Sequence, residues 1–198
     1  MLNITMNQKI ISLLLCLSPL SGCMTTTALP EQQRPNTWAT ALSTPYNFYQ
    51  VDAGLFRSEQ PQAALLPLLQ QQQINLVINL RSSNLDQKLL PQHGIEVVHV
   101  PIHTWAIDRE DLLQVMQQIQ RAQQQNKKVL IHCYHGSDRT GASVAMYRII
   151  FQQWPIAEAV REMRQGNYGF HPIWFNIEAL FQPENVKWIQ QQLLNPSQ

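Results

Sequence analysis

The sequence predicts a single α/β domain with a mostly parallel central sheet flanked by helices. Short apolar runs alternate with helix-like segments through the middle of the chain, and only helix-like segments follow. This is the order expected when helices cross over a parallel sheet and cover both of its faces. One apolar run, residues 129–131, leads into a polar loop, and open α/β sheets bind ligands at that end of a strand. We therefore expect the functional site to begin directly after residue 131.

Residues 1–22 are expected to be a signal peptide and not part of the fold. Lys9 precedes the apolar run 10–17. That run is too short to span a bilayer as a helix and has the layout of a secretory signal, with Met6 as an alternative start. The prediction is an exported protein.

A lipid anchor is expected to follow the signal. Leu20-Ser21-Gly22-Cys23 resembles the bacterial lipobox, which implies that Cys23 is lipidated and becomes the mature N-terminus. Met24 and not Asp follows the cysteine, which by the same resemblance favours the outer membrane. We expect a periplasmic lipoprotein of the bacterial cell envelope with a flexible tether at 23–47, because that segment is rich in Thr, Pro and polar residues, and a catalytic domain at 48–198.

The catalytic domain should open with a β-hairpin at 47–57, turning at 52–54. Further strands are predicted from apolar runs at 74–80, 95–100 and 129–131. Helices are predicted from apolar residues spaced by three or four positions, at 62–72, 87–93, 110–124, 140–153, 156–164, 173–181 and 184–194. Gly94 should end the second of these helices.

Composition excludes some classes of partner. The chain has 14 Lys and Arg against 13 Asp and Glu, a net charge of +1, and the basic residues form no run or stripe. Nucleic acid is therefore not an expected partner. No His, Cys and Asp group has the spacing of metal ligands, so we expect neither a metal nor another cofactor.

The ten residues 132–141, His-Cys-Tyr-His-Gly-Ser-Asp-Arg-Thr-Gly, join a strand to a helix. Backbone N–H groups converge at such a helix N-terminus and the helix dipole adds positive potential, so the loop is an anion site. That potential favours a thiolate at Cys133. Arg139 offers a planar fork that matches two phosphate oxygens, and Gly136 lets the backbone turn with its amides inward. A thiolate in a phosphate cradle predicts nucleophilic attack on phosphorus.

This stretch resembles the H-C-x-x-G-x-x-R-[ST]-G pattern of the cysteine-dependent protein tyrosine phosphatases, with every fixed position filled. From about Tyr49 to Phe181 the chain looks like the compact dual-specificity-like phosphatases of bacteria, and stretches 54–61, 77–81 and 146–150 support this. The resemblance implies hydrolysis of phosphomonoesters, phosphotyrosine first and also phosphoserine or phosphothreonine, in proteins or small phosphoesters, through a phosphocysteine.

The resemblance assigns roles within the loop. Cys133 is the nucleophile, and Arg139 with the amides of residues 134–139 holds the phosphoryl oxygens. Thr140 donates its hydroxyl to the sulfur, although a helix N-cap is an equally good interpretation of this residue. His132 is expected to support the loop structurally. The substrate-binding residues are then Tyr134 and His135 at the rim, together with Gly136, Ser137 and Arg139.

The proton donor has two candidates. Family members usually carry an aspartate in the loop after the preceding strand, but here Trp105 stands at about that place and Asp108 is the nearest carboxylate. The second candidate is Asp138, inside the loop, as in a subset of the family that includes myotubularin-like lipid phosphatases. Glu110 or Asp111 is expected to cap the helix that follows Asp108.

Other functions remain alternatives. A phosphoinositide phosphatase often carries a Lys in the loop, where this chain has Ser137. A catalytically silent phosphate-binding module would need no nucleophile, yet Cys133 is present. For an arsenate-reducing or sulfur-transfer enzyme, the His before Cys133 and the Thr-Gly after Arg139 favour a phosphatase instead, and arsenate reduction would also require resolving thiols. The turn-rich segment 166–171 is expected to be a plain inter-helix loop, with a cleft wall as the alternative, and His171 a packed or surface residue.

Overall fold

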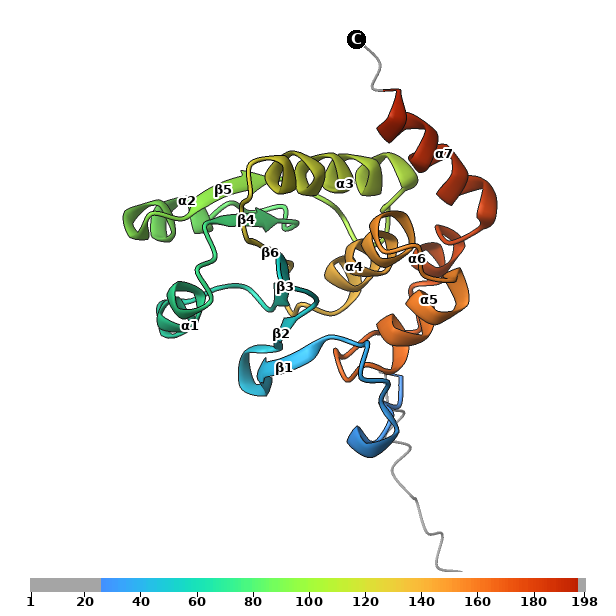
Figure 1. The fold of residues 1–198 in the computed structure, drawn as a ribbon, viewed down its shortest axis with the longest axis horizontal. Helices are drawn as coiled ribbons and strands as arrows, with labels where there is room; N and C mark the ends of the chain where they lie inside the picture. Colours follow the sequence, from blue (N-terminus) through green and yellow to red (C-terminus); the bar gives the residue numbers. More distant parts are fainter. Residues whose placement is uncertain (1–25, 196–198) are drawn as a thin grey trace, which may run out of the picture.

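The computed structural model describes residues 26–195 (Figure 1). The expected signal peptide and Cys23 lie outside these residues. No helix within 26–195 is both long and apolar enough to cross a membrane.

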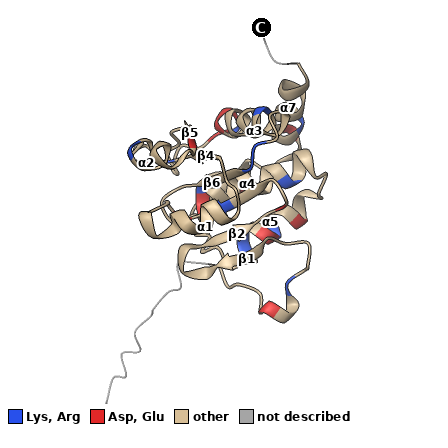
Figure 2. Cartoon of the chain, turned by 60° about the vertical axis from the view of Figure 1, so that its left-hand side comes forward, with Lys and Arg blue, Asp and Glu red and all other residues tan. Residues whose placement is uncertain are grey.

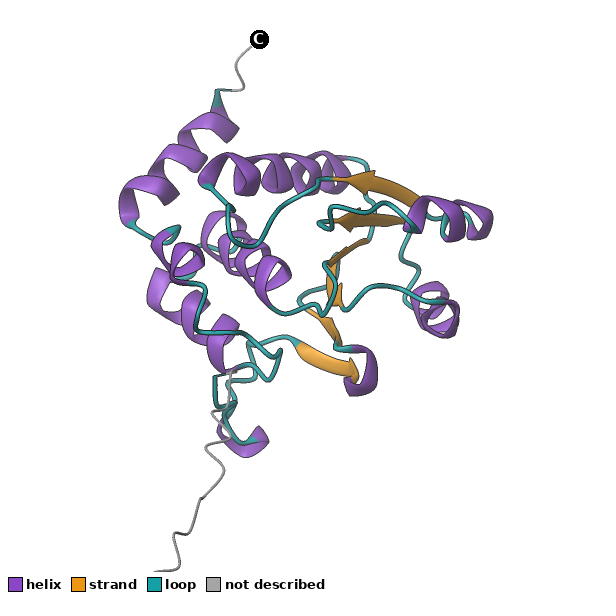
Figure 3. Ribbon diagram, turned by 180° about the vertical axis from the view of Figure 1, so that it is seen from behind, coloured by secondary structure: helices purple, strands orange, loops and turns teal. Residues whose placement is uncertain are grey.

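A six-stranded mixed sheet forms the centre of the molecule, in the order β1-β2-β3-β6-β4-β5 (Figure 3). Strands β3, β6, β4 and β5 run parallel, and β1 and β2 are added antiparallel at one edge. The predicted parallel sheet is therefore confirmed for its central strands. The strands are β1 (Thr40–Ser43), β2 (Phe48–Gln50), β3 (Leu55–Ser58), β4 (Leu76–Asn79), β5 (Glu96–His99) and β6 (Val129–His132).

Helices cover both faces of this sheet (Figure 1). The larger group lies on one face and consists of α3 (Arg109–Gln124), α4 (Asp138–Phe151), α5 (Ile156–Gln165), α6 (Phe175–Ala179) and α7 (Pro183–Leu194). On the other face lie α1 (Leu66–Gln71) and α2 (Asp86–Leu89). Four 3₁₀ turns complete the described elements: η1 (Glu31–Gln33), η2 (Thr44–Tyr46), η3 (Ala63–Leu65) and η4 (Pro91–His93).

Two hydrophobic cores follow from the alternation of side chains along the strands. On β6, Val129 and Ile131 face the core under α3 and α4, and Leu130 faces the smaller core under α1. On β3, Leu55 and Phe56 divide in the same way. Because both faces are covered, the central strands are apolar on both sides, which explains why they read as continuous apolar runs.

The predicted elements are confirmed with small shifts in their ends. The hairpin of β2 and β3 turns at residues 52–54, where the Asp52 carboxylate accepts hydrogen bonds from the Gly54 and Leu55 amides. Gly94 ends η4 with a φ of 73°. The helix predicted at 173–181 is shorter, because regular α-helix is confined to α6. Acidic and basic residues are interspersed along α3 and α5 (Figure 2).

The expected flexible tether is wrong for its described part, residues 26–47. Strand β1 lies within this segment, and Trp38 is buried with 3% of its surface exposed. The Trp38 indole donates a 2.7 Å hydrogen bond to Glu158, and the Ala39 amide donates one of 2.7 Å to Glu162. The polar composition suggested a tether, but the segment contains Trp38, which is buried, and strand β1, which forms the edge of the sheet.

Candidate active site

The candidate site is the loop between β6 and α4. The strand ends at His132 and the helix begins at Asp138, with Ser137 at the N-cap position. Helix α4 packs against α3, α5, β3 and β6, so the loop is fixed at both ends by buried elements. This is the strand–loop–helix arrangement that the sequence predicted.

Gly136 is required by the turn of this loop. Its φ is 71°, a left-handed conformation that favours glycine. A Cβ built on Gly136 would lie 2.4 Å from the carbonyl oxygen of Ser58, at the end of β3. The loop therefore packs backbone to backbone against the neighbouring strand, which fixes its height above the sheet.

Arg57, which the sequence analysis did not single out, holds the loop from below. Its side chain is buried, and Nη2 donates a 2.6 Å hydrogen bond to the Gly136 carbonyl. Its guanidinium lies 3.6 Å from the centroid of the Tyr168 ring. Burial lowers the pKa of the Arg57 guanidinium, against the opposing effect of Tyr168, Glu162 and Cys133 nearby. The cation thus braces the loop from the protein interior.

Cys133 is a free thiol with 3% of its surface exposed. His132 beside it is fully buried, and its Nδ1 lies 2.9 Å from the Cys133 carbonyl oxygen. The other ring nitrogen, Nε2, lies 3.3 Å from Oδ2 of Asp86, without hydrogen-bond geometry. These contacts fit the supporting role expected of His132. Asp86 was missed, because in the sequence it is an ordinary polar residue at a helix start.

The Arg139 guanidinium is held by two backbone carbonyls. Nη1 donates to the carbonyls of Leu80 and Ile102, at 3.2 and 3.0 Å. These carbonyls follow β4 and β5, so the carboxyl ends of both strands hold the side chain. The buried Nε has no hydrogen-bond partner among residues 26–195. The edge formed by Nε and Nη2 is therefore the one available for two oxygens of a phosphoryl group.

Thr140 is the third residue of α4, so the N-cap interpretation is wrong. Its hydroxyl is buried and finds no partner within the described chain. The hydrogen bond expected from this hydroxyl to the Cys133 sulfur is therefore not formed in this structure. A buried hydroxyl without a partner is costly, so the atom is suited to donate to a bound ligand.

The two candidate proton donors have different partners: Asp138 contacts His171, whereas Asp108 caps helix α3. Asp138 has 9% of its surface exposed, and its carboxylate contacts His171. Asp108 is the N-cap of α3, and its Oδ1 accepts a 2.9 Å hydrogen bond from the Asp111 amide. In return, the Asp108 amide donates a hydrogen bond to the Asp111 carboxylate, which completes a capping box. The expectation that Glu110 or Asp111 caps this helix is confirmed for Asp111, which is half of the capping box, although the N-cap residue itself is Asp108. Trp105, in the loop that leads to Asp108, is 68% exposed and stacks on His103.

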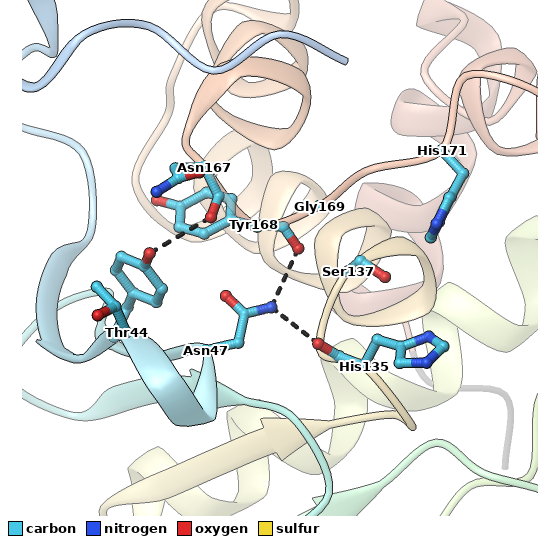
Figure 4. Close-up of a pocket in the computed structure, with 9 residues that line it drawn as sticks. Thr44, Asn47, His135, Ser137, Asn167, Tyr168, Gly169 and His171 are labelled. Carbon is cyan, nitrogen blue, oxygen red and sulfur yellow. Dashed lines mark hydrogen bonds between the residues drawn. The ribbon is translucent and has the colours of Figure 1, made fainter. Parts of the chain in front are cut away.

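A pocket of about 430 Å³ adjoins the loop (Figure 4). His135 and Ser137 form one wall, whereas Tyr134 is outside it and 55% exposed, with the Arg81 guanidinium 5.4 Å from its ring centroid. Asn47 joins the two sides of the pocket, because Nδ2 donates to the carbonyls of His135 and Tyr168. The segment 166–171 is thus a pocket wall and not a plain inter-helix loop. The remaining lining residues are Thr44, Tyr49, Asn167, Gly169 and His171.

Comparisons with known proteins agree with this geometry. Residues 55–183, more than half of the chain, match the family described as dual specificity phosphatase, catalytic domain. The dual specificity protein phosphatase TpbA of Pseudomonas aeruginosa strain UCBPP-PA14 is 37% identical over 136 residues, covering 69% of this chain and 62% of the relative. The dual specificity protein phosphatase MPK-4 of Drosophila melanogaster is 28% identical over 136 residues, covering 64% of this chain and 35% of the relative.

A crystal structure of a cysteine-to-serine variant of P. aeruginosa TpbA in complex with phosphotyrosine superposes with a TM-score of 0.75 at 31% identity. The superposition covers 82% of this chain and 99% of that one. The sheet, the flanking helices and the loop at the end of β6 are therefore those of a known phosphatase fold, and the family model spans both β6 and α4. The chain belongs to the dual specificity phosphatase family.

Proposed function

We propose that this protein hydrolyses phosphomonoesters, with phosphotyrosine as the main class of substrate, through a phosphocysteine on Cys133. The observation that carries the proposal is the buried thiol placed at the foot of a loop whose arginine has one guanidinium edge free. The relative crystallised with phosphotyrosine supports this substrate class. Phosphoserine and phosphothreonine are further substrates of the same loop, as the family's description suggests.

The reaction has two steps. In the first, the Cys133 thiolate attacks phosphorus, so that an S–P bond forms while the bond to the leaving oxygen breaks and that oxygen takes up a proton. In the second, water attacks phosphorus, the S–P bond breaks and the thiolate is restored. Arg139 and the loop amides hold the three equatorial oxygens throughout, which is the largest protein contribution to phosphoryl transfer. The Thr140 hydroxyl stabilises the sulfur as it leaves.

Asp138 is the proton donor in this proposal. Its side chain begins at the first residue of α4, inside the loop, and 12% of it is exposed. Asp108 is a poorer candidate because its carboxylate is committed to capping α3. A general acid must reach the leaving oxygen in the bound complex, and the place of Asp138 inside the loop, directly before Arg139, supports its assignment to this role. Asp138→Asn should therefore slow phosphotyrosine hydrolysis far more than para-nitrophenyl phosphate hydrolysis, because p-nitrophenolate leaves readily without a proton.

The test of the function is turnover of phosphotyrosine and para-nitrophenyl phosphate by the purified protein and by Cys133→Ser. We expect the wild type to release phosphate from both and the variant to release none while still binding vanadate or phosphate. A silent binding module would bind these anions without any turnover in the wild type. Turnover by Cys133→Ser equal to wild type would contradict the phosphocysteine.

The curated TpbA sequences are longer than the matched part, since this chain spans 62% of their length.

We propose, from the sequence alone, that the domain is exported and anchored by lipid on Cys23, as a periplasmic lipoprotein of the outer membrane. An acylated cysteine with several chains anchors stably. The wild type should enter the detergent phase and be labelled by radioactive palmitate in a bacterial host. Cys23→Ala should do neither, whereas partitioning that survives this change would refute the anchor.

A further inference from the structure

His171 contacts Asp138 through two separate groups. The backbone amide of His171 donates a 2.9 Å hydrogen bond to Oδ1 of Asp138. The ring nitrogen Nδ1 lies 2.9 Å from Oδ2 and 3.1 Å from Oδ1. The Ser137 hydroxyl is 3.4 Å from Oδ2. The carboxylate is therefore held in one orientation by a residue from the segment that follows α5.

Within residues 26–195, no Lys or Arg forms a salt bridge with Asp138, and His171 is the basic side chain within salt-bridge distance of it. The residues lining the adjoining pocket include no Lys, Arg, Asp or Glu. The titratable side chains that face the pair from that pocket are His135, whose ring centroid is 6.5 Å from that of His171, and the phenols Tyr49 and Tyr168. Figure 4 shows the His135 and His171 rings flanking Ser137. Among the described residues, the His171 imidazole is the side chain that contacts both carboxylate oxygens of Asp138, and it adds to the bonds from the His171 amide and the Ser137 hydroxyl.

We infer that His171 is a positioning residue for the proton donor Asp138. This inference rests on the function proposed above and names a residue that the loop pattern does not contain. Asp138 gives its proton to the leaving oxygen in the first step and accepts a proton from the attacking water in the second. Both transfers need the carboxyl at one fixed place relative to phosphorus, and a misplacement of about 1 Å can cost about 100-fold in rate. The contact at Nδ1 provides that constraint.

The substitution that separates positioning from general stability is a matched pair at residue 171. His171→Asn keeps an amide nitrogen bonded to Cγ, close to the place of Nδ1, whereas His171→Ala removes it. We expect His171→Ala to lower kcat for phosphotyrosine by about 10- to 100-fold with little change in KM. His171→Asn should remain within a few-fold of wild type. Both should hydrolyse para-nitrophenyl phosphate nearly as wild type does, because that leaving group does not need the proton.

A double-mutant cycle provides the second readout. If His171 acts through Asp138, His171→Ala should have no further effect on phosphotyrosine turnover once Asp138→Asn is present. The exposed His93 of η4, on the opposite face of the sheet, is the control, and His93→Ala should match wild type on both substrates. Thermal unfolding of each variant would confirm that it is folded.

Three results would overturn the inference: full phosphotyrosine turnover by His171→Ala, an equal loss on both substrates, or losses from His171→Ala and Asp138→Asn that multiply in the double variant. In each of these cases Cys133→Ser would still be inactive, so the proposed function would stand. Turnover that persists in Cys133→Ser, or its absence in the wild type, would instead remove the proposed function and this inference with it.

Discussion

Arg57 on β3 is joined to Gly136 in the loop between β6 and α4, the phosphate loop, by a hydrogen bond. The Arg57 Nη2 donates it to the Gly136 carbonyl oxygen at 2.6 Å. Both residues are buried, so this bond forms out of water and the loop depends on it. The bond directs the Gly136 carbonyl to the arginine in the protein interior. A buried cation thus braces the loop that we propose binds the phosphoryl group.

Arg57→Met should loosen the loop without removing any group that touches the substrate. A buried carbonyl left without its partner costs about 1–3 kcal/mol, so the unfolding free energy should fall and vanadate should bind more weakly. Calorimetric titration with vanadate and urea unfolding measure the two effects. Arg34→Met is the matched control, because Arg34 also lies near the Tyr168 ring but donates to Ala39 instead of the loop. Equal vanadate affinity in both variants would contradict the bracing role.

Gly136→Ala should abolish most of the activity. The methyl group would meet the Ser58 carbonyl at 2.4 Å, and the φ of 71° is unfavourable for alanine, at a cost of about 1–3 kcal/mol for the backbone alone. We expect a lower melting temperature together with a loss of phosphate binding by the folded protein. Gly94→Ala is the control, since Gly94 has a similar φ of 73° but open space around it. If both variants kept full activity, the close approach of loop and strand would not matter for catalysis.

Arg139→Lys should be severely impaired although the charge is kept. An ammonium group cannot contact two phosphoryl oxygens in the plane of a guanidinium, nor hold the Leu80 and Ile102 carbonyls at the same time. The loss in kcat should be about 100- to 1,000-fold, as for the removal of one donor that stabilises transition-state charge. Steady-state kinetics on para-nitrophenyl phosphate test this, because that substrate needs no proton donor. A variant within a few-fold of wild type would show that Arg139 does not bind the phosphoryl group.

Asp108→Asn should leave turnover of both substrates unchanged, because asparagine also caps helices and the proposed donor is elsewhere. Asp108→Ala should lower the unfolding free energy by about 1 kcal/mol through loss of the cap, again with normal kinetics. Urea unfolding and the ratio of phosphotyrosine to para-nitrophenyl phosphate turnover are the measurements. A selective loss of phosphotyrosine turnover in Asp108→Asn would identify Asp108 as the proton donor in place of Asp138.

Trp38→Ala should destabilise the domain by about 3–5 kcal/mol, the usual cost of removing a buried tryptophan side chain. The change would show that residues before β1 belong to the folded domain. Leu194→Ala is the comparison, because Leu194 is 80% exposed and should change stability little. Denaturant unfolding provides both values, and a Trp38→Ala variant as stable as wild type would restore the tether interpretation.

The sequence determined the parts of this protein that depend on neighbouring residues. Apolar runs buried on both faces identified the central strands, and the spacing within residues 110–124 identified α3. The phosphate loop is a continuous stretch of chain, so the positions of Cys133, Gly136 and Arg139 in it could be read directly. The local rules of turns, helix starts and side-chain periodicity suffice for such features.

Tertiary structure alone decided which distant residues serve that loop. Arg57, Asp86 and His171 lie far from Cys133 in sequence, and their local patterns do not show that they contact the loop. Their contacts arise because parallel strands and their connecting helices bring separate segments to one end of the sheet. The same reason accounts for the misjudged segment 26–47, since a strand added at a sheet edge is stabilised by pairing and by the burial of Trp38, which no property of that segment by itself reveals.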